Sequence, residues 1–193
     1  NAAFNAKNWD IAVVKYNEGV AAAPDFVGSA PVLLNNKGAA LRERAVIRYN
    51  TTIKATDPAA KVEGLKSVKA DLAEAADGYN RSWTMLNNAA PTDFTDPKVK
   101  ESQIAAAVAG ARDTFRLMAG REQVDETKLD IAKAMIPAYI ASETDAAKKE
   151  SALLILADIY RVAGDSNNAI AEYRKVLEAS PENLDAMSGL GLS

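Results

Sequence analysis

The chain has 193 residues, a net charge of −3 and a pI near 5.2, and it contains neither histidine nor cysteine. The acidic balance argues against a nucleic-acid partner, because such partners are held largely by lysine and arginine on phosphates. The two missing residue types exclude disulfides, thiol nucleophiles, thiolate zinc sites and histidine general bases. We therefore expect no enzyme activity, no metal and no cofactor.

The remaining composition predicts an all-α protein. Hydrophobic residues make up 48% and charged residues 25%, which is typical of a globular chain. Alanine, the strongest helix former, is abundant, whereas glycine and proline are few. No apolar run approaches the roughly 20 residues that span a bilayer, so no membrane insertion is expected. The absence of cysteine favours an exported or periplasmic bacterial protein over a cytoplasmic one.

Helix boundaries are marked by prolines and glycines. Capping side chains stand directly before proline at Asp57-Pro58, Asp96-Pro97 and Ser180-Pro181, which predicts three helix starts. Gly120 and Gly164 predict helix ends. Apolar residues three or four apart predict helices over 32–54, 58–87, 97–119, 125–143, 147–163 and 166–179.

Two of these helices are long and one contains a proline. Only three residues separate 32–54 from 58–87, so these helices are predicted to form an antiparallel hairpin. Pro137 is expected to kink the helix over 125–143. Six aromatic residues fall at helical core spacing and are interpreted as core rather than a stacking platform. They are Trp9, Tyr16, Tyr79, Trp83, Tyr160 and Tyr173.

A regular spacing recurs at the two ends of the chain. Ala169, Tyr173 and Pro181 are separated by the same intervals as Ala12, Tyr16 and Pro24. A small residue lets two helices approach closely, an aromatic side chain fills the groove, and proline starts the next helix. The spacing therefore predicts repeated helix pairs.

These residues resemble the tetratricopeptide repeat (TPR) family, with its Trp-x2-Leu-Gly-x2-Tyr, Ala-x3-Phe and Pro pattern. The resemblance covers 150–191 and 3–24, and Leu34, Gly38 and Leu41 take the places of three further pattern positions. It implies a right-handed α-solenoid of antiparallel helix pairs, with irregular middle units built from long helices. We expect one domain over 1–193, cut from a longer chain. Its units are about 1–26, 30–88, 96–144 and 146–181, and another starts at 182–193.

The resemblance also implies a function, the non-catalytic binding of a peptide or protein segment. Such a partner would lie in a concave groove lined by the first helix of each pair. Six residues point away from the packing stripe and are the candidate partner-binding residues, although each of them is equally compatible with merely solvating the groove. They are Asn35, Ala39, Arg42, Leu154, Asp158 and Arg161.

One acidic cluster is open to two interpretations. Asp71, Glu74 and Asp77 follow one another at steps of three along the helix over 58–87. A calcium site normally needs six or more oxygens from a tight loop, so we favour a solvated face with Arg81 as the partner of Asp77.

Two alternatives to peptide binding remain. In the first alternative, the chain is a structural spacer or a self-assembly module, and oligomers form through the open ends of the solenoid. In the second it is a small-ligand sensor with a pocket in the 32–87 hairpin.

Overall fold

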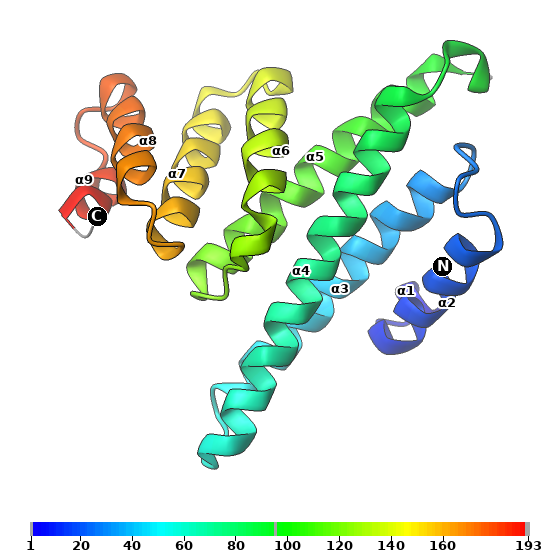
Figure 1. Cartoon of the computed structure of the whole chain (residues 1–193), viewed down its shortest axis with the longest axis horizontal. Coiled ribbons are helices and arrows are strands. Elements are labelled where there is room, and N and C mark those ends of the chain that lie inside the picture. Colours follow the sequence, from blue (N-terminus) through cyan, green and yellow to red (C-terminus); the bar gives the residue numbers. More distant parts are fainter. Residues whose placement is uncertain (1, 95, 192–193) are drawn as a thin grey trace. The chain divides into compact units, whose positions relative to one another are not determined.

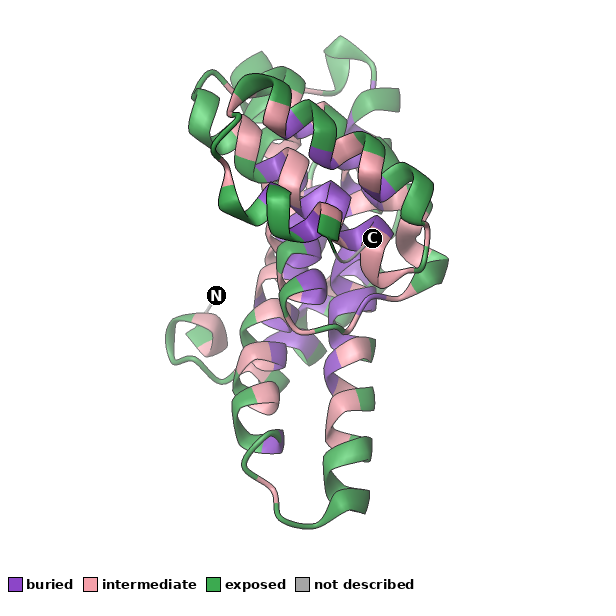
Figure 2. Ribbon diagram, turned by 90° about the vertical axis from the view of Figure 1, so that its left-hand side faces the viewer, coloured by how far each residue is buried: buried purple, intermediate pink, exposed green. Residues whose placement is uncertain are grey.

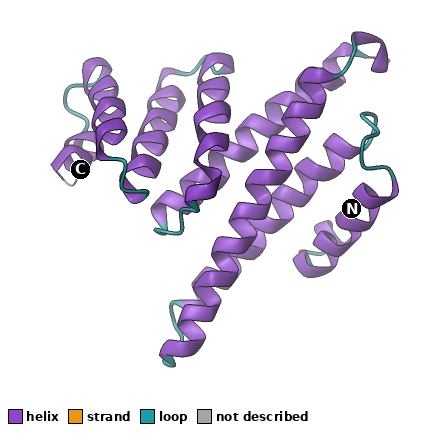
Figure 3. Ribbon diagram, in the orientation of Figure 1, coloured by secondary structure: helices purple, strands orange, loops and turns teal. Residues whose placement is uncertain are grey.

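A computed structural model describes residues 2–94 and 96–191, and this part of the chain contains α-helices and two short 3-10 turns but no strand (Figures 1 and 3). The predicted all-α fold is confirmed. The α-helices are α1 (Ala2–Asn5), α2 (Trp9–Ala22), α3 (Ala30–Thr52), α4 (Pro58–Asn88), α5 (Pro97–Gly120), α6 (Leu129–Ser142), α7 (Ala146–Val162), α8 (Ser166–Ala179) and α9 (Leu184–Gly191). The 3-10 turns are η1 (Pro91–Asp93) and η2 (Glu126–Lys128).

The chain divides into two compact units, Asn1–Ala111 and Arg112–Ser193. Helix α5 is continuous through the boundary, because it runs from Pro97 to Gly120. The expectation of a single repeat domain over 1–193 stays a prediction.

The first unit is built on the antiparallel hairpin of α3 and α4, as predicted. Asp57 ends the connecting turn and caps α4, since its Oδ1 accepts a hydrogen bond from the Ala59 backbone N–H at 3.0 Å. Near the other end of the hairpin, the buried Ser82 hydroxyl donates to the Pro31 carbonyl at 3.1 Å. The core runs from the middle of the two helices to the open end of the hairpin, whereas residues around the connecting turn are exposed (Figure 2).

Tyr79 of α4 is the central side chain of this unit. It is 2% exposed, and its ring leaves no room for a side chain at two glycines. A Cβ on Gly38 of α3 would lie 2.6 Å from the ring, and a Cβ on Gly110 of α5 would lie 2.2 Å from it. The two glycines therefore let three helices meet around one aromatic ring.

The second unit repeats this packing with a different tyrosine. Tyr173 of α8 is fully buried, and a Cβ on Gly189 of α9 would lie 2.2 Å from its ring. Helix α7 ends as predicted, because Gly164 has a φ of +79° and Asp165 caps α8 through the Asn168 N–H. Of the six predicted core aromatics, Tyr16, Tyr79, Tyr160 and Tyr173 are buried, and Trp9 and Trp83 are half-buried.

Two predicted boundaries are wrong. Ser180-Pro181 does not start a helix, because α9 begins at Leu184 and Asn183 caps it by accepting the Ala186 N–H at 2.9 Å. The Ser180 hydroxyl instead donates to Glu150. The helix expected from 125 begins at Leu129 after a 3-10 turn, and Pro137 lies inside it without ending it.

Candidate functional site

Two of the three candidate residues on α3 contact α5. Asn35 is only 6% exposed, and its Nδ2 donates to both the backbone carbonyl and the Oε1 of Gln103, each at 3.1 Å. Arg42 donates to the Gly110 carbonyl at 3.4 Å, and Ala39 between them is half-buried. Both contacts join residues 68 apart in the chain, so α3 and α5 run parallel here. Asn35 therefore packs against α5 and does not present its amide to an open groove.

Arg42 also covers the ring of Tyr79. Its guanidinium carbon lies 5.8 Å from the ring centroid, within the range of a cation–π contact. Together with the bond to Gly110, this places the charge of Arg42 over the junction of α3, α4 and α5. A structural role in the junction therefore explains Arg42 without a partner.

The candidate residues on α7 keep more of their surface accessible. Asp158 Oδ1 accepts the Tyr173 hydroxyl at 2.5 Å, and Arg161 Nε lies 3.6 Å from the same oxygen. Their side chains are nevertheless 43% and 27% exposed, and Leu154, one turn before Asp158, is half-buried. The structure thus brings Asp158 and Arg161 together at a surface that still offers polar atoms.

The hydrogen bond to Asp158 has an electrostatic consequence for Tyr173. The pKa of Tyr173 is raised to about 12. The largest cause is burial of the ring, and the hydrogen bond to Asp158 and the negative charge of that residue add to it. The phenol therefore stays protonated and keeps donating to Asp158 over the whole physiological pH range, which fixes the orientation of that carboxylate.

A network of charged residues was missed by the sequence interpretation. Asp71 is 3% exposed and accepts two hydrogen bonds from Arg44, at 2.7 and 3.1 Å, and one from Arg48 at 2.9 Å. Both arginines also reach Asp10 of α2, at 3.0 and 3.3 Å. The expected solvated face is therefore wrong for Asp71, which joins α2, α3 and α4 from a buried position. The hairpin register was the available signal, because the three-residue connection over 55–57 places Asp71 opposite residues near 41.

Glu74 and Arg81, the second of which was expected to pair with Asp77, contact other parts of the chain. Glu74 pairs with Lys37 of α3 at 2.6 Å. Arg81 donates to the Pro24 carbonyl at 2.8 Å and lies 3.6 Å from Asp25. In the described residues, no group of three or more acidic side chains is arranged to hold a metal ion.

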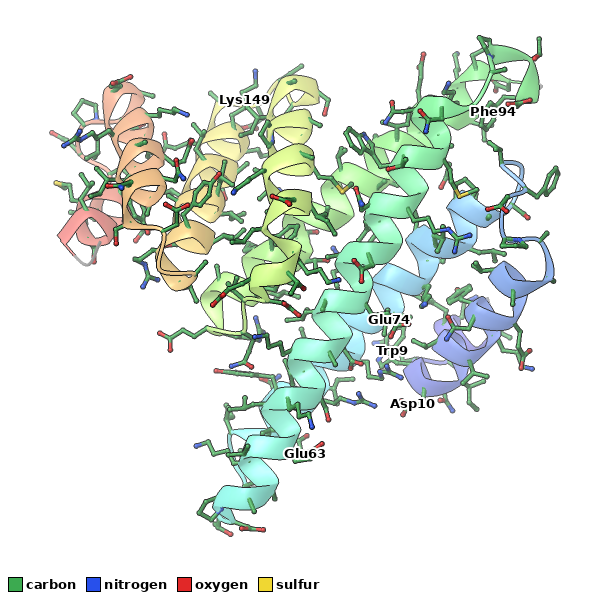
Figure 4. The ribbon with its side chains drawn as sticks, in the orientation of Figure 1. Trp9, Asp10, Glu63, Glu74, Phe94 and Lys149 are labelled. Atoms are coloured by element: carbon green, nitrogen blue, oxygen red, sulfur yellow. The ribbon has the colours of Figure 1, made fainter. Side chains whose placement is uncertain are left out.

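A pocket of about 190 Å³ lies at the open end of the α3–α4 hairpin, where α5 begins. Figure 4 shows Phe94, one of its lining residues, beyond the end of α4 and far from Glu63 near the connecting turn. The lining residues are Val27, Gly28, Pro31, Val32, Leu86, Asp93, Phe94, Asp96, Val99 and Gln103. The sequence suggested a pocket within the 32–87 hairpin but not this position.

Comparison with protein-family models gives no match for the chain, and comparison with curated proteins gives none either. Within the described part of the chain, no helix has both the length and the apolar character needed to cross a membrane.

Proposed function

We propose that this chain is a non-catalytic interaction module of TPR type, a right-handed solenoid that binds a peptide or protein segment along the first helices of its pairs. The supporting observation is the repeated packing of tyrosine on glycine. Tyr79 of α4 lies on Gly110 of α5, and Tyr173 of α8 lies on Gly189 of α9. In both cases the second helix of one expected pair presents a tyrosine to the first helix of the next, which is how stacked repeats share a core.

The accessible part of the expected groove lies on α7. Asn35 and Arg42 are engaged with α5, whereas Asp158 and Arg161 keep exposed polar atoms beside the half-buried Leu154. A half-buried leucine with a cation and an anion beside it suits a short peptide, because the charges orient the segment and the apolar contact adds affinity. We therefore place the principal partner contacts on Leu154, Asp158 and Arg161.

Selection of phage-displayed random peptides on the immobilised chain tests this function. The affinity of an enriched peptide is then measured by fluorescence anisotropy for the wild type and for Arg161→Gln. Glutamine is preferable to glutamate here, because a new carboxylate would stand beside Asp158 and disturb the fold. We expect Arg161→Gln to weaken binding by about tenfold, since the loss of one charge-assisted contact is worth about 1–2 kcal/mol.

Arg174→Gln provides the matched control. Arg174 is an exposed arginine on α8, the second helix of the same pair, so its loss removes the same charge from outside the proposed groove. Binding should be unchanged in this variant. Failure to enrich any peptide, or equal weakening by both variants, would contradict the proposed groove.

A second candidate function is self-assembly, favoured by exposed apolar side chains on two helices. Leu184 and Met187 of α9 are 75% and 43% exposed, and Ile11 and Val14 of α2 are 49% and 52% exposed. Burial of such faces between copies would remove apolar area from water. Multi-angle light scattering across a concentration series distinguishes the two candidates, because a chain that stays monomeric at high concentration contradicts self-assembly.

A further inference from the structure

The pocket at the open end of the hairpin has the size and lining of a small-ligand site. Its volume is about 190 Å³, and a cavity of about 150 Å³ lined by apolar side chains suffices for benzene. Pro31, Val32, Leu86 and Phe94 supply apolar walls, and Leu86 is fully buried. Val99 at the start of α5 is 47% exposed, which leaves an apolar side chain accessible from solvent. The walls therefore suit an apolar body no larger than an aromatic ring with a short substituent.

Two carboxylates in the lining give the pocket a negative charge. Asp93 Oδ2 accepts the Ala90 N–H at 2.8 Å, and Asp96 Oδ1 accepts the Lys98 N–H at 2.9 Å. Each carboxylate thus uses one oxygen for the backbone, and among the described residues neither of them forms an ion pair. Lys100, one turn into α5, instead donates to the Ala89 carbonyl at 2.9 Å. Both carboxylates are exposed, and no cationic side chain in the described part of the chain lies within ion-pair distance of them, although the Lys100 ammonium lies 5.9 Å from the centroid of the Phe94 ring.

An amide in the same lining has a fixed orientation. Gln103 Oε1 and the Gln103 backbone carbonyl both accept hydrogen bonds from Asn35 Nδ2 at 3.1 Å. Exchange of the Gln103 amide atoms would set two N–H groups against each other, so Oε1 must face Asn35. The Gln103 side chain is therefore held in place by Asn35 within the pocket lining.

We propose that this pocket binds a small organic cation, an amine carried on an aryl or branched aliphatic body. The apolar body lies between Val32, Leu86 and Phe94, and the ammonium group is held by the carboxylates of Asp93 and Asp96. A charge-assisted hydrogen bond to an unpaired carboxylate gives the site its preference for cations over neutral or anionic molecules of the same shape. This activity is separate from peptide binding on α7, and either can hold without the other.

The test titrates 15N-labelled protein at pH 7 with 2-phenylethylamine, which is protonated at this pH, and with its neutral match 2-phenylethanol. We expect saturable amide shifts for the amine, confined to residues around 27–32, 86–94 and 96–103. The amine should bind about fivefold more tightly than the alcohol, because a contact with an exposed carboxylate is worth at most about 1 kcal/mol. Absence of saturable shifts at these residues, or equal affinity for the two molecules, overturns the proposal.

Three aspartate variants make the test specific. Asp93→Asn and Asp96→Asn retain an oxygen for the backbone N–H and remove only the charge, so both helical turns stay capped. Asp57→Asn makes the same change at the cap of α4, outside the pocket. The double variant Asp93→Asn/Asp96→Asn should lose the preference for the amine, and Asp57→Asn should keep it. If the double variant and Asp57→Asn lost the preference for the amine equally, the cause would be the overall charge of the protein, and the assignment would be overturned.

A fourth variant tests the apolar walls independently of charge. Val32→Phe places a larger side chain in the pocket while leaving both carboxylates in place. It should abolish the shifts from both molecules. Unchanged binding of the amine to Val32→Phe would place the ligand elsewhere and contradict the proposal.

Discussion

At the scale of single residues, several side chains of this protein satisfy backbone groups at helix ends, and Glu143 does so most fully. It lies just after α6, where its Oε1 accepts the backbone N–H groups of Thr144 and Asp145 at 2.9 and 3.1 Å. Its Oε2 accepts the Tyr139 hydroxyl at 2.8 Å. These hydrogen bonds lower the pKa of Glu143 to about 2. The bond from the Asp145 N–H has the largest effect, and the bond from the Tyr139 hydroxyl has the second largest.

This shift predicts a pH dependence of stability. The folded pKa of Glu143 lies below its ordinary value of 4.5, so the ionised form stabilises the fold above pH 4.5, and this contribution is lost as the pH falls from about 4.5 to about 2. Glu143→Gln should therefore have a lower Tm than the wild type at pH 6, and the difference should shrink towards pH 2.5. Thermal unfolding followed by circular dichroism at these two pH values provides the measurement.

The control for this prediction is Glu178→Gln. Glu178 is an exposed residue of α8, in the same unit. Its replacement should leave the difference in Tm near zero at both pH values. A difference for Glu143→Gln that stays constant between pH 6 and pH 2.5 would contradict the role assigned to its charge.

At the scale of secondary-structure elements, the hairpin of α3 and α4 depends on a buried charge network as well as on apolar packing. Asp71 receives hydrogen bonds from two arginines of α3, and these arginines also hold Asp10 of α2. Two cations face two anions, so each buried charge is compensated. Removal of Asp71 leaves Arg44, whose side chain is largely buried, without full compensation, which costs more than the pair contributes to stability.

Asp71→Asn should accordingly lower the free energy of unfolding by about 3 kcal/mol. This value is at the low end of the range for a broken buried pair, because Arg48 is partly exposed. Urea unfolding provides the measurement. Glu63→Gln on the same helix removes a carboxylate that is 72% exposed and 3.9 Å from Lys66, and it should change stability by less than about 0.5 kcal/mol. A similar small effect of Asp71→Asn would show that the network does not hold the hairpin.

The elements themselves were largely predictable from the sequence, and their side-chain partners were not. Local signals such as the Asp57 cap before Pro58 and the Gly164 turn predicted helix ends that the structure confirms. Ser180 failed because its hydroxyl is used by Glu150, 30 residues away, and no local pattern contains that contact. Asn35 was assigned to an open groove for the same reason, since its bonds to Gln103 cross 68 residues. Helix starts depend on neighbours in sequence, whereas exposure depends on how the helices pack.

At the scale of the whole molecule, the chain consists of two compact units that share one continuous helix. Each unit contains its own tyrosine–glycine contact, Tyr79 on Gly110 in the first and Tyr173 on Gly189 in the second. Both tryptophans, Trp9 and Trp83, belong to the first unit. Tryptophan fluorescence therefore reports on the first unit, while far-ultraviolet circular dichroism reports on the helices of both.

Substitution at the two glycines should separate the units. Gly110→Ala and Gly189→Ala each put a Cβ 2.2 Å from a buried tyrosine ring, so each should cost about 1–3 kcal/mol through overpacking. The chain divides into two compact units, so each unit should respond mainly to a substitution within it. We therefore expect Gly110→Ala to lower the urea midpoint measured by fluorescence, and Gly189→Ala to lower only the midpoint measured by circular dichroism.

Gly120→Ala is the control, because a Cβ on this last residue of α5 meets nothing within 4 Å. Alanine favours the helix over glycine, so this variant should be at least as stable as the wild type by both probes. A fluorescence midpoint that falls equally in Gly110→Ala and Gly189→Ala would mean that the continuous α5 couples the two units into a single cooperative transition. Unequal shifts of the fluorescence midpoint would mean that each unit keeps its own stability although α5 joins the two units. A peptide bound on α7 would then raise the unfolding midpoint of the second unit alone.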